Sequence, residues 1–178
     1  FLMEDLWNYF DDSAKPYYNM LSTTAKNTYY GKMVQKELFP TDYTGKPVPK
    51  FTLTDQDGKS ITLAELGKGK KYTIIDFWAS WCHPCRMEIP NFKKIYAAYA
   101  DKGLQIISIS IDKDEAAWKK ALSEEKMAWP SYLDRNGVAS LYNVRAIPAI
   151  FLIDAQGKLV SDKLRGESLA DKLAELLK

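Results

Sequence analysis

The chain has only two cysteines and one histidine among its 178 residues. Two cysteines cannot form the framework of several disulfides that staples a small secreted domain. No apolar stretch approaches the ~20 residues that a membrane-spanning helix needs. The net charge is +2, and lysine and arginine form no cluster, so nothing indicates binding to nucleic acid or to a membrane surface. Internal repeats and low-complexity tracts are also missing.

The first residue is Phe1 rather than methionine, and no leader sequence is present. We therefore expect the chain to be a piece of a longer precursor, so the missing leader says nothing about the native protein. A content of 46% hydrophobic and 27% charged residues is typical of a globular protein. The length predicts one domain with a sizeable core, or one domain with an appendage.

Residues 1–40 are rich in aromatic side chains and lack runs of β-branched residues. Apolar residues recur at helical spacing at 6–10 and again at 29–34. We predict two helices with a turn near residues 11–16, where Pro16 either starts the second helix or breaks the first. The polar residues 41–46 read as a linker.

From residue 47 the pattern becomes that of an α/β domain. Strands are expected at 51–54 and 60–63, as a hairpin around Asp57-Gly58, and at 72–78, 104–111, 149–153 and 159–164. Helices are expected at 84–101, 115–126, 138–142 and 169–177, with a helical turn at 63–66. This order implies a parallel pair of strands with an antiparallel edge.

Both cysteines lie in the segment Trp81-Cys82-His83-Pro84-Cys85, between a buried strand and a helical pattern. A CxxC pair at the start of a helix brings two sulfurs within disulfide reach across one turn. The first sulfur lies at the positive end of the helix dipole, which favours the thiolate, and the thiolate is the form that attacks disulfides. The pattern predicts a thiol-disulfide oxidoreductase. A zinc site is the alternative, but it normally needs four ligands, and this loop has two cysteines and one histidine.

Three separated segments resemble the thioredoxin superfamily. Residues 76–85 look like its active-site segment, Pro90 falls where the active-site helix is kinked, and Ile147-Pro148 looks like its cis-proline loop. The hairpin at 51–59, together with residues 82–90, is similar to the TlpA/ResA-like extracytoplasmic thiol-disulfide oxidoreductases.

The resemblance covers residues 47–178 and implies a thioredoxin-like fold, in which helices flank a central mixed sheet and a β-hairpin precedes it. Residues 1–40 resemble the helical lead-in of multidomain Bacteroidetes-type members, and residues 41–46 would link the two parts. No cofactor or metal is implied beyond a redox-active disulfide between Cys82 and Cys85.

The resemblance also implies a setting. Its members are exported, for example to the periplasm, and often membrane-anchored, here through a segment upstream of Phe1. They commonly reduce protein disulfides, including those of apocytochrome c, and contribute to cell redox homeostasis. An upstream electron donor, thioredoxin-like or a membrane reductase, would restore the dithiol.

The expected catalytic residues are Cys82, Cys85, Asp76 and Pro148, and the first three carry the proton and electron chemistry. Cys82, as the more exposed sulfur, is the predicted nucleophile, and Cys85 is the resolving thiol. Asp76 interrupts a buried strand, where a carboxylate is costly and tends to have a raised pKa. The resemblance implies that Asp76 assists deprotonation of Cys85, although many TlpA/ResA-like members lack an aspartate there. A partly hydrated structural aspartate is the alternative.

Residues around the sulfurs are expected to tune the site. A cationic His83 would stabilise the Cys82 thiolate, and Pro84 would stiffen the loop; the alternative is an exposed histidine with little effect. If Pro148 is cis, the backbone of Ile147 can pair with an extended substrate by β-strand addition, whereas the alternative is an ordinary loop proline.

The tryptophans and charges near the pair are less specific. Trp78 and Trp81 either wall the site or belong to the core. Arg86 and Glu88 fit the family pattern, but on physical grounds alone they are solvated helix charges, and we assign them no role.

Two other functions compete with disulfide reduction. A peroxidase is suggested because the hairpin also occurs in peroxiredoxins, but those carry proline and threonine where this chain has Ile75 and Ala79. The other is a partner-binding scaffold, in which the N-terminal helices recruit a partner. Their aromatic density also predicts packing on the α/β domain or on a second copy, as a homo-oligomer.

Overall fold

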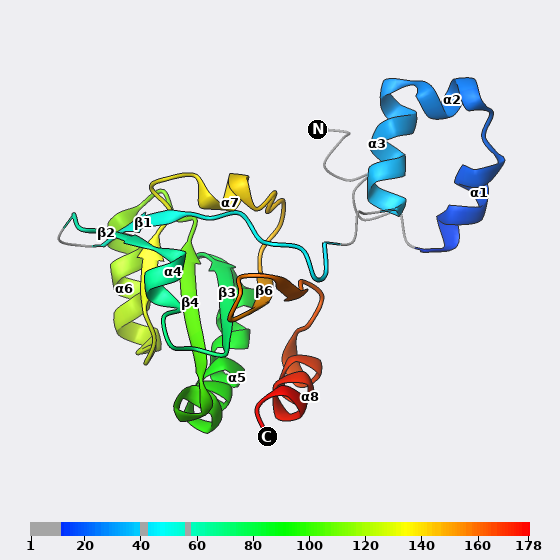
Figure 1. The fold of residues 1–178 in the computed structure, drawn as a ribbon. Helices are drawn as coiled ribbons and strands as arrows, with labels where there is room; N and C mark the ends of the chain where they lie inside the picture. The colour runs from blue at the N-terminus through cyan, green and yellow to red at the C-terminus, as the bar shows by residue number, and fades with distance from the viewer. Residues whose placement is uncertain (1–11, 40–42, 56–57) are drawn as a thin grey trace. The chain divides into compact units, whose positions relative to one another are not determined.

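The computed structural model describes residues 12–39, 43–55 and 58–178. The chain divides into two compact units, residues 1–43 and 44–178 (Figure 1).

Within residues 12–39 the first unit contains three α-helices, where the sequence predicts only one, the second of its two N-terminal helices. A 3-10 turn at Asp12–Ala14 precedes α1 (Lys15–Met20), α2 (Thr23–Asn27) and α3 (Tyr29–Leu38). Pro16 occupies the first turn of α1, so it starts a helix rather than breaking one. The helical pattern predicted at 6–10 lies outside the described residues.

Two side-chain caps divide the expected second helix. The Ser22 hydroxyl accepts a hydrogen bond from the Ala25 N–H, and the Thr28 hydroxyl accepts one from the Gly31 N–H. Each cap residue has extended backbone and starts a new helix. Gly31 is required at its position, because a Cβ there would lie 2.1 Å from the Ala25 carbonyl oxygen.

The described part of the second unit is built on a mixed sheet with the strand order β5-β4-β3-β6-β7. The central strand β3 (Tyr72–Trp78) runs parallel to β4 (Leu104–Ser110), and β4 runs parallel to β5 (Ser131–Leu133). On the other side, β6 (Ala149–Asp154) is antiparallel to β3, and β7 (Leu159–Ser161) is antiparallel to β6. β3 and β4 are almost entirely buried because helices cover them.

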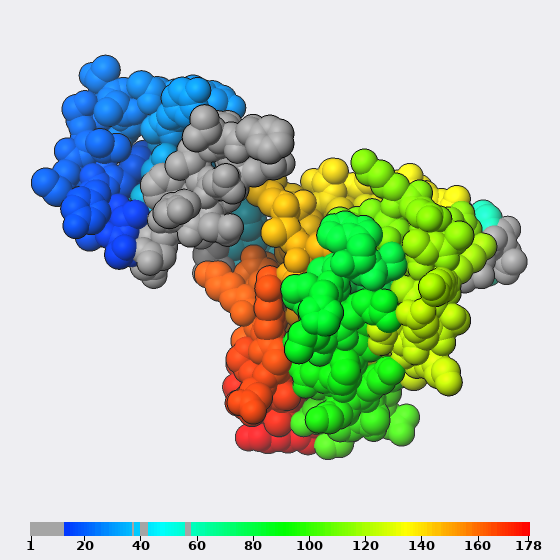
Figure 2. Space-filling model, turned by 180° about the vertical axis from the view of Figure 1, so that it is seen from behind, coloured from blue at the N-terminus to red at the C-terminus, as the bar shows by residue number. Residues whose placement is uncertain are grey.

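One face of the sheet is covered by α5 (His83–Tyr99), α6 (Glu115–Glu125) and α8 (Gly166–Leu176), whose apolar residues share one core cluster. The chain steps from β3 through α5 to β4 and through α6 to β5 in the same direction. Right-handed crossovers therefore place α5 and α6 on the same face. Figure 2 shows α5 and the C-terminal helix together on this face.

The opposite face is covered by the hairpin of β1 (Thr52–Thr54) and β2 (Ser60–Thr62), by α4 (Leu63–Leu66) and by α7 (Val138–Leu141). β1 and β2 are antiparallel, with Leu53 opposite Ile61. Residue 57 of the predicted hairpin turn lies outside the described residues.

These layers confirm the predicted α/β fold class, a mixed sheet flanked by helices with an N-terminal hairpin. The main error is β5, which the sequence analysis missed. It is only three residues long and fully buries only Leu133, so it carries almost no periodic signal. The sheet consequently has three parallel strands rather than a pair, and β7 ends at Ser161 rather than at 164.

Candidate active site

Cys82 and Cys85 form a disulfide at the start of α5, with an S–S distance of 2.03 Å and a Cα–Cα distance of 5.3 Å. Both residues belong to the core cluster under α5. Cys82 exposes 5% of its surface and Cys85 exposes 2%. Cys82 is thus the more exposed of the two cysteines, as expected, but it is much more buried than the sequence suggested.

The start of α5 explains why these two sulfurs meet. Cys82 is the N-cap, with extended backbone, and its Sγ accepts a hydrogen bond from the Cys85 N–H at 3.3 Å. Pro84 fits the first turn because a first-turn N–H has no partner within the helix. After reduction, the Cys85 N–H and the helix dipole would stabilise a Cys82 thiolate.

Asp76 lies beneath this helix, in the middle of β3. Side chains alternate along a strand, so Asp76 shares a face with Ile74 and Trp78, which belong to the same cluster as both cysteines. The sheet thus brings the Asp76 carboxylate to the face that Cys85 covers. Asp76 exposes only 2% of its surface.

The surroundings of Asp76 raise its pKa from 3.8 to about 7. Burial is the main cause, because it disfavours the charged form. A hydrogen bond from the Ser108 hydroxyl to Oδ2, at 3.0 Å, acts in the opposite direction. The negative charge of Glu88, on α5, raises the pKa further.

Glu88 also connects two helices. Its Oε1 accepts hydrogen bonds from the Asn91 side chain at 2.7 Å and from the Gly166 N–H at 3.0 Å, at the start of α8. Glu88 is therefore half-buried and partnered rather than a solvated charge, which corrects the reading from the sequence.

Arg86 is likewise engaged. Its guanidinium contacts Glu125 at 2.6 Å and Glu124 at 2.8 Å, which ties the first turns of α5 to the end of α6. The reading of Arg86 as a solvated charge is also corrected.

The remaining predicted site residues occupy different environments. Trp81 is 67% exposed, and His83 and Pro84 are exposed beside it. Trp78 is instead a fully buried core residue and forms no wall open to solvent. The Ile147–Pro148 peptide bond is cis, and Ile147 packs against the cluster that contains both cysteines.

A buried aspartate that the sequence analysis missed braces the active-site loop. The Asp112 carboxylate accepts hydrogen bonds from the Ser80 N–H at 2.8 Å and from the hydroxyls of Ser80 and Ser110, both at 2.6 Å. Ser80 follows β3 and Asp112 follows β4, and the carboxyl ends of parallel strands meet at one edge of a sheet. Their position after two neighbouring parallel strands is the sequence signal that could have identified the contact between Ser80 and Asp112.

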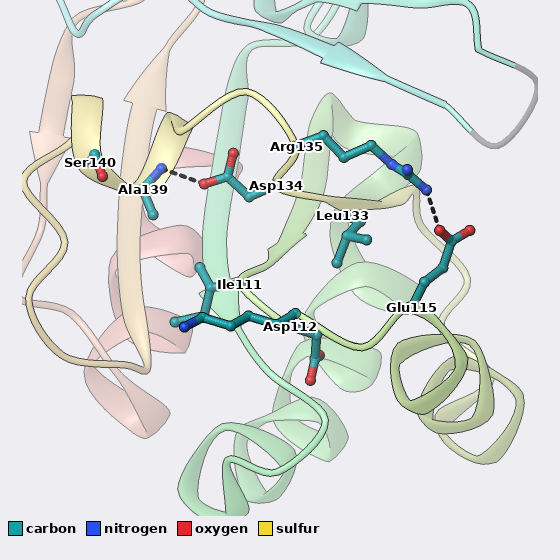
Figure 3. A pocket seen from close by; sticks show the side chains of 9 residues that line it. Ile111, Asp112, Glu115, Leu133, Asp134, Arg135, Ala139 and Ser140 are labelled. Atoms are coloured by element: carbon teal, nitrogen blue, oxygen red, sulfur yellow. Dashed lines mark hydrogen bonds and ion pairs between the residues drawn. The ribbon is translucent and has the colours of Figure 1, made fainter.

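Next to this brace lies a pocket of about 590 Å³ (Figure 3). The Arg135 and Glu115 side chains form an ion pair at its rim, and the Asp134 carboxylate accepts from the N–H groups of Val138 and Ala139. The pocket contains neither cysteine. It is lined by Ile111, Asp112, Lys113, Glu115, Leu133, Asp134, Arg135, Ala139 and Ser140.

Among the described residues, no group of three or more His, Cys, Asp and Glu side chains is arranged to hold a metal ion. Within the same residues, no helix combines the length and apolar character needed to cross a membrane.

A CxxC disulfide at the start of a helix, above a buried carboxylate and on a mixed sheet, defines a thiol-disulfide oxidoreductase with a thioredoxin-like fold. The model of the AhpC/TSA family matches residues 44–161, so the chain belongs to that family.

Known relatives agree with this class. The chain is 35% identical over 136 residues to the thiol-disulfide oxidoreductase ResA of Bacillus thuringiensis, covering 75% of this chain and 76% of that protein. It is similar to the crystal structure of the thioredoxin domain of a thiol-disulfide oxidoreductase from Bacteroides vulgatus (TM-score 0.70, 35% identity, 78% of this chain and 100% of that one). The solution structure of a thiol:disulfide interchange protein from Bacteroides sp. is also similar (TM-score 0.68, 36% identity, 75% and 90%). The protein is an enzyme of this type, and its resemblance to TlpA/ResA-like proteins is confirmed.

Proposed function

We propose that this chain reduces disulfides in protein substrates, with Cys82 as the nucleophile and Cys85 as the resolving thiol. The supporting observation is the asymmetry of the pair. Cys82 caps α5 and accepts the Cys85 N–H, while Cys85 lies one turn further into the core, on the face that carries Asp76.

The first step forms a mixed disulfide. The Cys82 thiolate attacks one sulfur of the substrate disulfide, a Cys82–substrate S–S bond forms, and the other substrate sulfur leaves as a thiolate that takes up a proton. The attack consumes the thiolate form, which the helix N-terminus stabilises.

The second step releases the product. The Cys85 thiol gives its proton to the Asp76 carboxylate, the Cys85 thiolate attacks Cys82 Sγ, and the Cys82–Cys85 bond forms as the second substrate thiolate leaves. The departing thiolate takes up the proton that Asp76 releases. In total two electrons pass from the enzyme to the substrate disulfide, while one proton comes from Cys85 and one from the solvent. With a pKa of about 7, Asp76 can both accept and release a proton near neutral pH.

The residues around the two cysteines would bind the substrate and tune the reduction potential. Trp81 offers an exposed apolar surface beside Cys82, and His83 and Pro84 lie between the sulfurs and affect the reduction potential. Ile147, followed by Pro148, packs at the edge of the cysteine cluster, and its backbone would pair with an extended substrate segment.

We further propose an extracytoplasmic setting, such as the periplasm, with apocytochrome c among the substrates. A dithiol donor, either thioredoxin-like or a membrane reductase, would restore the enzyme. Residues 1–40 would form a helical appendage, residues 41–46 a linker and residues 47–178 the redox domain. The similarity to ResA supports the setting, and the two compact units are compatible with this division.

Trapping the mixed disulfide tests the assignment of the two sulfurs. With a disulfide-bonded substrate such as insulin, Cys85→Ser should accumulate a covalent adduct that a dithiol reverses on a non-reducing gel. Cys82→Ser should form no adduct and lose all turnover. An adduct formed by Cys82→Ser would mean that Cys85 is the nucleophile.

The reduction potential of the Cys82–Cys85 couple tests whether the enzyme reduces or forms disulfides. A reductase is expected near the thioredoxin value of about −270 mV rather than the DsbA value of about −120 mV. A value at the oxidising end would assign the site to disulfide formation instead.

A further inference from the structure

Three fully buried side chains from separate parts of the second unit form one hydrogen-bonded chain. The Trp129 indole N–H donates to Ser108 Oγ at 2.9 Å, and the Ser108 hydroxyl donates to Asp76 Oδ2 at 3.0 Å. Ser108 lies on β4 directly opposite Asp76 on β3, and Trp129 precedes β5. All three residues are at most 5% exposed.

The chemistry of the donors fixes the direction of this chain. An indole N–H can only donate, so Ser108 Oγ must accept from Trp129. The hydroxyl hydrogen of Ser108 is then available to Asp76. Without the indole, the hydroxyl would be free to rotate and to accept instead of donate.

Aromatic contacts hold the indole in place. The Trp129 ring lies edge-on to Phe92, at 6.1 Å between centroids, and to Tyr96, at 5.6 Å. Both partners belong to α5, the helix that begins at the two cysteines. The helix that positions the sulfurs therefore also positions the first donor of the chain.

We propose that Trp129 and Ser108 are positioning residues that hold the Asp76 carboxylate as a proton acceptor, with Oδ2 anchored and Oδ1 receiving the proton of Cys85. The proposal rests on the role of Asp76 given under Proposed function. It adds two residues that act on the resolution step through Asp76.

The charged and titratable groups around Asp76 determine whether loss of the Ser108 hydrogen bond raises or lowers the pKa of Asp76. The charge of Glu88 on α5 acts on it, the Ser108 hydroxyl contacts it from β4, and its partner on β6 is the apolar Ile150. Cys82 and Cys85 belong to the core cluster on the same face of the sheet. The Ser108 hydrogen bond favours the ionised carboxylate and opposes both burial and Glu88. Removing the Ser108 hydroxyl should therefore raise the pKa of Asp76.

The test is the pH profile of mixed-disulfide resolution in single turnovers of the reduced 178-residue chain with a disulfide-bonded peptide. Ser108→Ala should move the acid midpoint upward by about one pH unit. The ionised fraction at pH 7 would then fall about fivefold, and the resolution rate at that pH would fall with it. Trp129→Phe keeps a ring and should shift the midpoint in the same direction by less.

A double-mutant cycle separates a chain from two independent effects. If Trp129 acts through Ser108, Trp129→Phe should add no shift in the Ser108→Ala background. The double variant also removes the indole N–H that Ser108→Ala leaves unpaired, so it keeps the test open if the single variant folds poorly. Additive shifts of the midpoint would show that Trp129 does not act through Ser108, and would overturn the proposal.

Ser110→Ala is the matched control, because it removes another fully buried hydroxyl of β4 that contacts Asp112 rather than Asp76. Its midpoint should equal that of the unchanged chain, whatever happens to its rate. An equal shift in Ser110→Ala and Ser108→Ala would refute the proposal.

Asp76→Asn distinguishes failure of the inference from failure of the proposed function. If Asp76→Asn leaves the acid limb of the profile in place, Asp76 is not the proton acceptor and the proposed role falls. If it abolishes the limb while Ser108→Ala leaves the midpoint unchanged, only the inference about Ser108 and Trp129 falls.

Discussion

Replacing Asp76 by asparagine should make the chain's stability respond differently to pH. In the oxidised protein the pKa of Asp76 is raised from 3.8 to about 7, chiefly by burial. The unfolded chain ionises this group near pH 4, whereas the folded chain keeps it protonated until about pH 7. Folding therefore loses free energy as the pH rises through this window, and the loss is complete above pH 7.

The size of the effect follows from the shift. About three pH units at ~1.36 kcal/mol each amount to about 4 kcal/mol. Asp76→Asn carries no titratable group here, so its unfolding free energy should gain about 4 kcal/mol relative to the unchanged chain between pH 4 and pH 8.5. The asparagine amide contributes a constant offset, which cancels in this difference.

Urea unfolding of the two oxidised proteins at several pH values measures the quantity directly. The m-values should agree, because both proteins expose the same surface. All other titrating groups are shared, so only the difference between the two curves matters. Parallel curves from pH 4 to pH 8.5 would show that Asp76 titrates normally, and would also remove the physical basis for its role in proton transfer.

Two further perturbations address other parts of the chain. Arg86→Ala should lower the unfolding free energy by about 1 kcal/mol, because it breaks two ion pairs between α5 and α6 at a partly exposed position, and the loss should shrink in high salt; an unchanged value at low salt would contradict this. A protein that starts at Thr41 should differ from the full chain in oligomeric state, measured by light scattering, or in melting temperature. The reason is that several side chains of the first unit expose large apolar surfaces, namely Tyr17, Met20, Tyr29 and Tyr30. An unchanged oligomeric state and an unchanged melting temperature would together contradict the predicted packing of that segment.

The active site depends on β4, the parallel neighbour of β3. Ser108 of β4 supports Asp76, while Asp112, just beyond β4, braces Ser80 in the loop that leads to Cys82. One parallel pair of strands thus orients both the predicted proton acceptor and the loop of the predicted nucleophile. Substitutions of Ser108 or Ser110 on β4 should consequently affect the redox chemistry through these contacts.

The sequence alone was enough to locate the redox pair and to predict the fold class. Local signals carry both: two cysteines one turn apart before a helical pattern, a nearly continuous apolar strand whose one charge is Asp76, and a proline that fits a first helical turn. The same local logic failed at β5, which is too short for periodicity, and in the first unit, where Ser22 and Thr28 cap new helices.

Only the tertiary structure revealed what surrounds the sulfurs. Ser108 lies 32 positions from Asp76 in the sequence, and Trp129 lies 21 positions from Ser108. Strand register and the packing of α5 on the sheet bring these side chains together, and no pattern within a single helix or strand encodes that meeting. Burial is also a property of the assembled sheet and helices, because the desolvation that raises the pKa of Asp76 comes from groups distant in sequence. The sequence therefore predicted the two cysteines and Asp76 as the reacting groups, while the folded structure determined how strongly Asp76 holds its proton.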